Sequence, residues 1–253
     1  MATSNPAHCH RRRLLRLAAF GALALGIALS AAGARAQPAG GATLKIGIIG
    51  AGREGGALGA LLVKAGHPVM FSSRNPEELK GLVDSLGPLA KAGTVAQATD
   101  FGDVVMIVVP YTAMQQIGRD YGPALAKKQA VIDVSNPIAR RDGADLVKSV
   151  DEQGGAGLAT AKILPGARLV RGFNAIGYMK LTADAHRAGE PLGVPIAGDD
   201  QGAVATASAL IREMGFEPVL VGGLAKGKYL VPGTPLGGEH TPAELRQIAA
   251  GLS

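Results

Sequence analysis

Residues 44–55 read Leu-Lys-Ile-Gly-Ile-Ile-Gly-Ala-Gly-Arg-Glu-Gly, a short apolar run that leads directly into a cluster of glycines. The run is rich in β-branched residues and too short for a helix, which predicts a buried strand. A helical pattern of apolar residues follows from Gly55 to Ala65, and Gly66 is placed to end it. This segment therefore predicts a strand, a glycine-rich turn and a helix in immediate succession.

The glycines of this turn have the G-x-G-x-x-G spacing of dinucleotide-binding sites. Gly50 permits the tight turn, Gly52 lets the backbone approach a diphosphate, and Gly55 lets the helix pack closely on the strand. The diphosphate would then meet the free N–H groups at the start of the helix. The alternative is a turn that needs glycine for packing alone. We expect the whole loop to bind a dinucleotide: Gly50, Ala51, Gly52, Arg53, Glu54 and Gly55.

The rest of the chain alternates apolar strands with helices. Further strands are expected at 68–72, 103–109, 130–134, 168–173, 194–197 and 218–221, and helices at 76–86, 114–126 and 201–214. Strands that are apolar on both faces predict an α/β fold with a doubly wound, mostly parallel sheet of the Rossmann type over residues 44–222. A short extension, 223–253, departs from this alternation, with a Gly/Pro-rich loop followed by a helix that begins at Thr241.

The end of the second predicted strand indicates which dinucleotide is bound. An NAD site has an acidic residue about 20 residues after the glycines, to hold the ribose hydroxyls. This chain has Ser72, Ser73 and Arg74 there, whose hydroxyl and guanidinium groups are donors for a 2′-phosphate. Arg53 adds a second positive charge. A capped turn before the next helix is also compatible with these residues. We expect NADP as the cofactor.

Two further strand ends point to the same edge of the sheet. Val109 and Pro110 follow the third of these strands, and Asn136 and Pro137 follow the fourth. Ligands of open α/β sheets lie outside the carboxyl ends of the strands. We therefore expect these four residues to border the nicotinamide end of the cofactor, with ordinary proline turns as the alternative.

The motifs taken together resemble the coenzyme F-420-dependent NADP oxidoreductase family. The N-terminal fold of that family is shared with pyrroline-5-carboxylate reductase and with the NADPH domain of the six-transmembrane metalloreductases. The resemblance covers roughly residues 44–222 and implies hydride transfer between NADPH and a flat acceptor. It also implies that Phe173 and Asn174 border the reaction site. The motifs that carry it are 48–52, 72–75, 108–110, 133–137 and 173–174.

Residues for acid–base chemistry are scarce in the sequence. Direct hydride transfer between stacked rings depends on alignment more than on an acid or a base. Tyr229, in the Gly/Pro-rich tail, is a weak candidate proton donor, and Tyr178 is another. We expect His67, His186 and His240 to lie at the surface, and because they lack ligand spacing we expect no bound metal.

These observations favour an NADP-dependent oxidoreductase that acts on a flavin-like, deazaflavin or other small acceptor. A non-catalytic NADP-binding sensor or accessory protein is the main alternative. A third possibility is the reduction of metal ions through a flavin partner. Apolar surface in the C-terminal extension would suit a homodimer.

Residues 1–36 have the pattern of a secretory signal peptide. Basic residues at 11–13 precede an apolar run from 17 to 34, and Ala34-Arg35-Ala36 provides a cleavage site. The arginines also resemble a twin-arginine signal, although His10 stands where Ser or Thr is usual. A membrane anchor is the alternative. We expect cleavage, a linker at 37–43, and an exported, periplasmic protein with no stable membrane insertion.

The charge of the chain excludes one class of partner. The formal net charge of +6 rests on 26 basic and 20 acidic residues, and the leader alone holds five arginines and no acid. The remainder is therefore close to neutral, without the basic surface of a nucleic-acid binder. The single cysteine, Cys9, also lies in the leader, so a cleaved chain has no thiol for disulfides or metal ligation.

Overall fold

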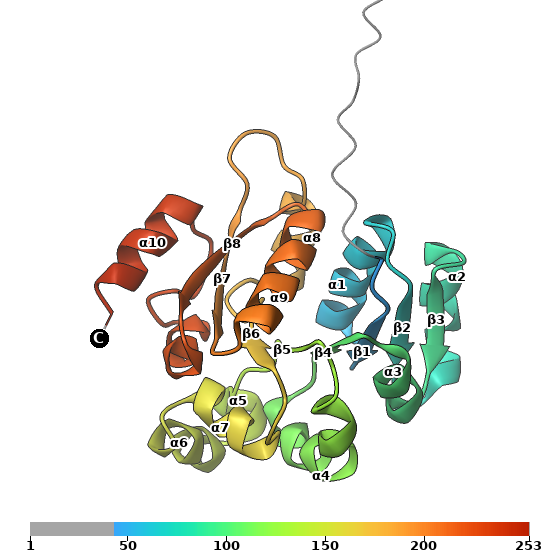
Figure 1. Ribbon diagram of the computed structural model, residues 1–253, viewed down its shortest axis with the longest axis horizontal. Helices are drawn as coiled ribbons and strands as arrows, with labels where there is room; N and C mark the ends of the chain where they lie inside the picture. Colours follow the sequence, from blue (N-terminus) through green and yellow to red (C-terminus); the bar gives the residue numbers. More distant parts are fainter. Residues whose placement is uncertain (1–42, 253) are drawn as a thin grey trace, which may run out of the picture. The chain divides into compact units, whose positions relative to one another are not determined.

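The computed structural model of the protein describes residues 43–252 and has one eight-stranded sheet with helices packed on it (Figure 1). The predicted signal peptide and residues 37–42 of the predicted linker lie outside this range. The predicted α/β fold is confirmed. The strands are β1 (Ile46–Ile49), β2 (Val69–Ser72), β3 (Ala90–Gly93), β4 (Val104–Ile107), β5 (Ala130–Asp133), β6 (Leu169–Arg171), β7 (Gly193–Gly198) and β8 (Glu217–Gly222).

Helices connect the strands over most of residues 43–252, and none of them is both long and apolar enough to cross a membrane. The α-helices are α1 (Arg53–Lys64), α2 (Lys80–Leu86), α3 (Val95–Phe101), α4 (Met114–Leu125), α5 (Ala139–Asp142), α6 (Ala144–Glu152), α7 (Ala156–Ile163), α8 (Tyr178–Asp184), α9 (Gln201–Glu213) and α10 (Pro242–Ala250). Short 3₁₀ turns are η1 (Pro76–Leu79), η2 (Tyr111–Ala113) and η3 (Leu224–Leu230).

The strand order in the sheet is β3-β2-β1-β4-β5-β6-β7-β8. The first six of these strands are parallel, so their carboxyl ends share one edge of the sheet. The chain order reverses between β1 and β4, which is the position where ligands bind in open α/β sheets. This topology places the ends of β1, β2, β4, β5 and β6 around one crevice.

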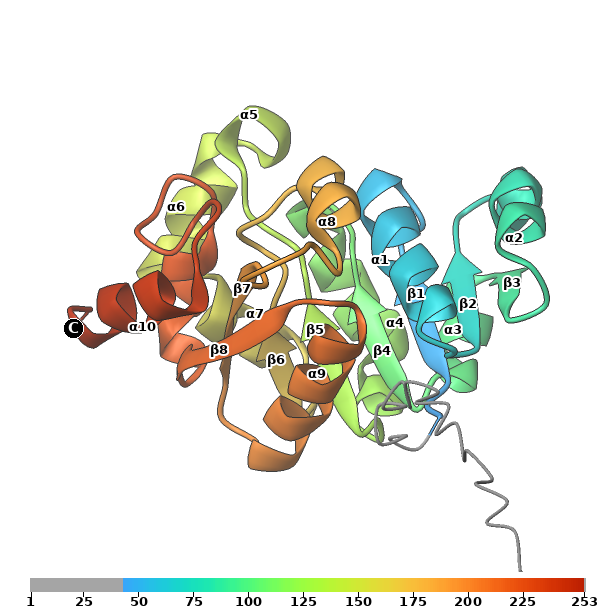
Figure 2. The ribbon, with the colours of Figure 1, turned by 90° about the horizontal axis from the view of Figure 1, so that it is seen from above.

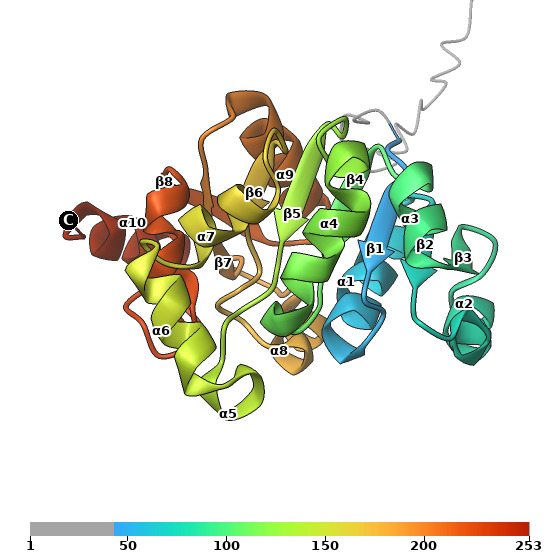
Figure 3. The ribbon, with the colours of Figure 1, turned by 90° about the horizontal axis from the view of Figure 1, so that it is seen from below.

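Alternate residues of the strands point into two separate hydrophobic layers. On β4, Val104 and Met106 pack with α1, α8 and α9, whereas Val105 and Ile107 pack with α4, α6 and α7. Figures 2 and 3 show these two faces of the sheet in turn. Burial on both faces explains why the strands read as continuous apolar runs in the sequence.

The C-terminal extension packs on the last two strands of the sheet. Leu230, Leu236 and Leu245 form a third buried cluster with Ala197 of β7 and Val219 of β8. The helix α10 begins at a capping box, in which the Thr241 side chain accepts from the Glu244 amide, as the sequence predicted. The extension is therefore part of the folded core.

The structure differs from the predicted elements in several places. The strand predicted over 103–109 ends at Ile107, and the strand predicted over 168–173 ends at Arg171, because the following residues turn into the crevice. The strand β3 was not predicted, because its two middle residues are exposed and give no apolar run. No direction was predicted for β7, which pairs antiparallel with β6 and, together with β8, runs opposite to the rest.

The close packing of α1 on the sheet gives a testable prediction about two glycines of the same helix. A Cβ at Gly59 would lie 2.1 Å from the Phe71 ring, whereas a Cβ at Gly56 would meet only Leu82, at 3.9 Å. We expect Gly59→Ala to lower the free energy of unfolding by about 1–3 kcal/mol through overpacking. Gly56→Ala should leave the free energy of unfolding unchanged or raise it by up to about 1 kcal/mol.

Denaturant unfolding of the two variants and the parent measures this difference. Equal free energies of unfolding for the two alanine variants would contradict the packing described here.

Candidate active site

Two adjoining pockets lie along the carboxyl edge of the parallel strands. Their volumes are ≈ 620 Å³ and ≈ 730 Å³, and both are lined by Gly52, Val108, Val109 and Pro110. We call them the first and the second pocket, respectively. The shared residues come from the glycine loop after β1 and from the turn after β4, so the two pockets form one elongated cleft across the point where the chain order reverses.

The glycine loop has the three structural features that the sequence predicted. Gly50 has a φ of 101°, and a Cβ there would lie 2.3 Å from the carbonyl oxygen of Val108. A Cβ on Gly55 would lie 2.1 Å from the carbonyl oxygen of Gly50, so α1 packs directly on the turn. Gly52, in contrast, faces open space, because a Cβ added there would have nothing within 4 Å.

The start of α1 is accessible from that open space. Gly52 is the N-cap residue of α1 and has no side chain to cap the free N–H groups of the first turn. Such groups bind anions, and the missing Cβ lets a diphosphate approach them. The loop therefore fits the diphosphate of a dinucleotide.

The second pocket contains the residues that the sequence predicted for the 2′-phosphate. Ser72, Ser73 and Arg74 all line it, together with Ala51. The hydroxyl of Ser72 is buried and donates to the carbonyl of Ile48 at 2.8 Å, so it ties β2 to β1. Ser73 accepts from a backbone amide through its Oγ, which leaves its hydroxyl proton available, and Arg74 is exposed. Ser73 and Arg74 thus keep donors that fit a phosphate, whereas the Ser72 hydroxyl is occupied.

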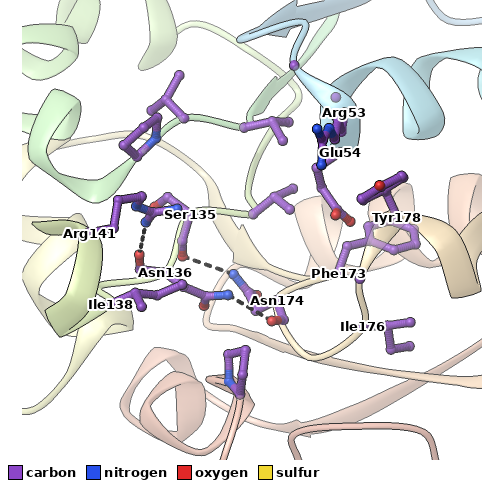
Figure 4. A pocket seen from close by; sticks show the side chains of 18 of the residues that line it. Arg53, Glu54, Ser135, Asn136, Ile138, Arg141, Phe173, Asn174, Ile176 and Tyr178 are labelled. Carbon is purple, nitrogen blue, oxygen red and sulfur yellow. Dashed lines mark hydrogen bonds between the residues drawn. The ribbon is translucent and has the colours of Figure 1, made fainter.

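The first pocket is formed by the ends of β5 and β6 and by the start of α8 (Figure 4). Asn136, Phe173 and Asn174 all line it, as the sequence predicted, and Tyr178 and Arg53 complete one side. The Arg53 guanidinium lies 6.0 Å from the centroid of the Tyr178 ring.

Beneath the first pocket lies a buried ion pair between neighbouring strands. The side chains of Asp133 and Arg171 are both 0% exposed, and an Nη atom of Arg171 donates to a carboxylate oxygen of Asp133 at 2.7 Å. The same oxygen accepts from Thr160 at 2.9 Å, and the other accepts from the amide and hydroxyl of Ser135. Tyr111 closes the network, with its hydroxyl 3.0 Å from that of Thr160, and burial raises the pKa of Tyr111 to about 12.

The two asparagines that line the pocket are held by Arg171 and by the backbone at the end of β5. The second Nη atom of Arg171 donates to the side-chain oxygen of Asn136, and the Asn136 amide donates to the carbonyl of Asn174. The Asn174 amide donates to the carbonyls of Asp133 and Ser135. Its side-chain oxygen is buried and has no partner within residues 43–252. The two asparagines are therefore tied to each other and to β5, with one buried acceptor left unpaired.

Phe173 has a backbone conformation that non-glycine residues rarely adopt. Its φ is 61°, in the left-handed region, and its ring is buried against Phe216 in an edge-to-face contact at 6.1 Å. Such a conformation costs about 1–3 kcal/mol and persists only where surrounding contacts enforce it. Here the hydrogen bonds of Asn174 and the Phe216 contact enforce it, and the chain turns at this point into the pocket.

Glu54 places a carboxyl group in the first pocket from the first turn of α1. Figure 4 shows its side chain on the same side of the pocket as Phe173 and Tyr178. Burial raises the pKa of Glu54 to about 7, and a hydrogen bond from the Tyr178 backbone amide only partly offsets this effect. From the sequence, Glu54 was expected to bind the cofactor with the rest of the loop, and nothing in the local pattern indicated this shift.

Several other expected positions lie elsewhere. Pro137 and the weak candidate Tyr229 line neither pocket, and Tyr229 packs on the C-terminal cluster beside Lys226 and Lys228. Pro232, from the same tail, does line the first pocket.

The histidines stand apart from the cleft, because neither pocket is lined by His67, His186 or His240. The expectation of a surface position was wrong for His67, which is buried and 2.6 Å from Glu213. Among residues 43–252 no group of three or more metal-ligating side chains occurs.

The buried pair under the site was not predicted from the sequence. Asp133 and Arg171 interrupt otherwise apolar strands, and a charged residue in such a strand is almost never buried without a partner. That interruption was the available signal. The basic residues Arg140 and Arg141, which also line the first pocket, lie in a segment that gave no distinctive pattern.

Comparisons with known proteins identify a family of oxidoreductases that this chain resembles. Residues 45–137 match the family described as NADP oxidoreductase, coenzyme F420-dependent. Metalloreductase STEAP3 of Rattus norvegicus is 29% identical over 187 residues, which are 73% of this chain and 35% of that protein. The chain spans about a third of the length of the curated relatives it matches.

Two solved structures are similar along most of their own length. A hypothetical protein from Sinorhizobium meliloti superposes with a TM-score of 0.66 and 28% identity, over 78% of this chain and 95% of that one. A protein described as an F420-dependent NADP reductase from Arthrobacter sp. FB24 has a TM-score of 0.63 at 20% identity, over 73% and 87% of the two chains, which supports the fold.

The fold is of the Rossmann class, and the family whose model matches residues 45–137 is one of NADP-dependent oxidoreductases. Within that class, the match is to the coenzyme F420-dependent NADP oxidoreductases, so the resemblance predicted from the sequence is confirmed.

The buried pair gives a prediction about stability. We expect Arg171→Met to lower the free energy of unfolding by about 3–5 kcal/mol, because Asp133 would remain buried without its partner. Lys148→Met removes an exposed lysine that pairs with Glu152 along α6. This variant should change the free energy of unfolding by less than about 0.5 kcal/mol. Chemical denaturation compares the two variants, and similar losses would refute the role given to Arg171.

The raised pKa of Glu54 predicts a dependence of stability on pH. The pKa in the folded state, about 7, exceeds the ordinary glutamate value of 4.5, so the folded state binds the proton more tightly than the unfolded chain. The stabilisation is present below pH 4.5 and is lost as the pH rises to about 7.

Glu54→Gln should therefore be more stable than the parent at pH 8, by about 1–2 kcal/mol after allowance for partial exposure, and nearly equal at pH 4.5. Glu152→Gln, on the exposed face of α6, is the control. Thermal unfolding across this pH range measures the difference, and a constant offset at every pH would contradict a raised pKa.

Proposed function

We propose that the protein uses NADPH to reduce a small planar acceptor, by direct hydride transfer in the first pocket. The observation that carries this proposal is the continuity of the two pockets. The second pocket has Arg74 at the end of β2, and the first has Phe173 and Asn174 at the end of β6, with the glycine loop between them. This arrangement fits an extended dinucleotide with its reactive ring beside a second binding space.

The residues of the cleft have distinct tasks in this proposal. Bound NADPH supplies the hydride from its nicotinamide. Gly52 and the first turn of α1 bind the diphosphate, and Ser73 and Arg74 bind the 2′-phosphate. Asn136 is held by Arg171, and Asn174 is held by the backbone carbonyls of Asp133 and Ser135, so both are positioned to orient the reactants.

The composition of the first pocket supports a flat acceptor. The half-buried Tyr178 ring lines one side of the pocket, and an aromatic ring packs well on such a surface. Arg140 and Arg141 line the same pocket from α5, and since Arg141 is paired with Asp142, Arg140 is the basic group that would favour an acceptor with a negative group. Flavins, deazaflavins and other small acceptors of this kind fit these conditions.

A second candidate is the reduction of metal ions through a flavin. The observation that favours it is the similarity to the metalloreductase of Rattus norvegicus. This candidate requires reduced flavin as the intermediate carrier, so ferric reduction by the protein should depend on added flavin. A binding protein without catalysis would show neither NADPH consumption with acceptors nor ferric reduction.

Calorimetric titration with NADPH and NADH tests the cofactor site. We expect tighter binding of NADPH, and a 10- to 100-fold loss of NADPH affinity in Arg74→Ala, because a charge-assisted hydrogen bond to phosphate contributes about 1.5–3 kcal/mol. The affinity for NADH should change little in this variant.

Arg246→Ala is the matched control, since Arg246 is exposed on α10 and lines neither pocket. Equal affinities for the two nucleotides would refute an NADP-specific site. Binding of NADPH without turnover of flavin, deazaflavin or ferric acceptors would favour the non-catalytic alternative.

A further inference from the structure

Glu54 is an unusual residue to find in the first pocket. It lies in the loop that is expected to hold a diphosphate, yet its carboxyl group faces the pocket formed by Phe173, Asn174 and Tyr178. An acidic side chain in the first turn of a helix is ordinarily stabilised at the surface in its charged form. Glu54 is instead partly buried, which favours the neutral acid.

The hydrogen bonds of Glu54 leave one oxygen unused. The backbone amide of Tyr178 donates to the carboxyl group. The Oε1 atom is buried and has no hydrogen-bond partner in the part of the chain that the structure describes. A buried, unpaired carboxyl oxygen costs free energy unless a ligand or a solvent molecule completes it. The unpaired oxygen therefore adds to the burial that favours the neutral acid over the carboxylate.

We propose that Glu54 donates the proton that accompanies hydride transfer to the acceptor. This inference rests on the proposed function. It concerns acceptors in which the hydride bonds to one atom and leaves negative charge on a nitrogen or oxygen. The proton of the Glu54 carboxyl group goes to that nitrogen or oxygen.

Hydride and proton reach the acceptor from two different donors. The C–H bond at the reactive carbon of NADPH breaks, and its two electrons form the new bond of the acceptor. The O–H bond of Glu54 breaks, and its proton forms the N–H or O–H bond of the product. NADPH is oxidised to NADP⁺, the acceptor is reduced by two electrons, and the Glu54 carboxylate recovers its proton from water.

The protonation state of Glu54 suits this role. A pKa of about 7 leaves a large fraction protonated at neutral pH, and a general acid works best when its pKa is near the working pH. The other charged groups that line the same pocket are all basic: Arg53 from α1, and Arg140 and Arg141 from α5, of which Arg141 is paired with Asp142.

The other hydroxyl groups of the pocket are less suitable. The Ser135 hydroxyl donates to Asp133 at 2.5 Å and is therefore occupied. Tyr178 is the competing donor, because its ring lines the pocket below the Arg53 guanidinium. The experiment must separate Glu54 from Tyr178.

The test compares two hydride acceptors that differ in their need for a proton. Menadione, a quinone, needs a proton on oxygen, whereas N-methylacridinium is a cation that becomes neutral on accepting hydride. We expect Glu54→Gln to lower the ratio of the menadione rate to the N-methylacridinium rate by about 100-fold, the lower end of the range for general acids. The fall of this ratio above pH 7 in the parent should be absent from the variant.

Glu152→Gln makes the same chemical change on the exposed face of α6 and should leave the ratio at the parental value. An equal loss with both acceptors in Glu54→Gln would overturn the proposal, because it would indicate positioning of the cofactor. Loss of the pH dependence in Tyr178→Phe, with its retention in Glu54→Gln, would assign the proton to Tyr178 and overturn it as well.

A second readout does not depend on turnover. The infrared difference spectrum between the parent and Glu54→Gln, without nucleotide, should contain the C=O stretch of a protonated carboxyl group that titrates near pH 7. Absence of this band at pH 6 overturns the proposal even if both acceptors are reduced. If the band titrates as expected but the parent reduces neither acceptor, the proposed function itself fails, and the proton-donor role fails with it.

Discussion

The ion pair between Asp133 and Arg171 is the interaction on which the rest of the site depends. The two residues are aligned partners on β5 and β6, and both are removed from water. A buried pair of this kind is weak evidence for stability in itself, since its desolvation cost offsets much of its attraction. Its value here is geometric, because both oxygens of the Asp133 carboxylate accept hydrogen bonds that hold neighbouring elements.

The surroundings of Arg171 explain how this charge can be buried. A Cβ at Gly227 of η3 would lie 2.7 Å from Cδ of Arg171, and a Cβ at Gly157 of α7 would lie 2.0 Å from the carbonyl oxygen of Leu224. Only glycine allows η3 and α7 to close over the arginine stem. The C-terminal extension and the middle of the chain thus meet at the residue that positions Asn136.

Much of the fold could be predicted because the local signals of the sequence agree with its packing. A strand buried on both faces, such as β4, has to be continuously apolar, and the turn after β1 needs Gly50 for a positive φ. The exposed edge strand β3 carries neither signal. The helix α3 was missed although Thr94 and Gln97 form a capping box at its start, a pattern that was present in the sequence.

The residues of the candidate site also fall into two groups, those that the sequence predicts and those that it does not. The cofactor loop and the Ser73-Arg74 pair are local motifs, so spacing along the chain is enough to find them. The role of Glu54 depends on burial by α8, and that of Arg171 depends on β5, η3 and α7, which are distant in sequence. Contacts of this type arise from tertiary packing, and no single stretch of the chain encodes them.

The contact between the C-terminal extension and the cleft has a consequence for folding during synthesis. Pro232 lines the first pocket, and Gly238 donates its amide to the carbonyl of Ala175 beside it. On the ribosome, the glycine loop and the β2 end emerge long before this segment. The nascent chain can therefore form the glycine loop and the second pocket early. The first pocket is completed only after synthesis has passed Gly238.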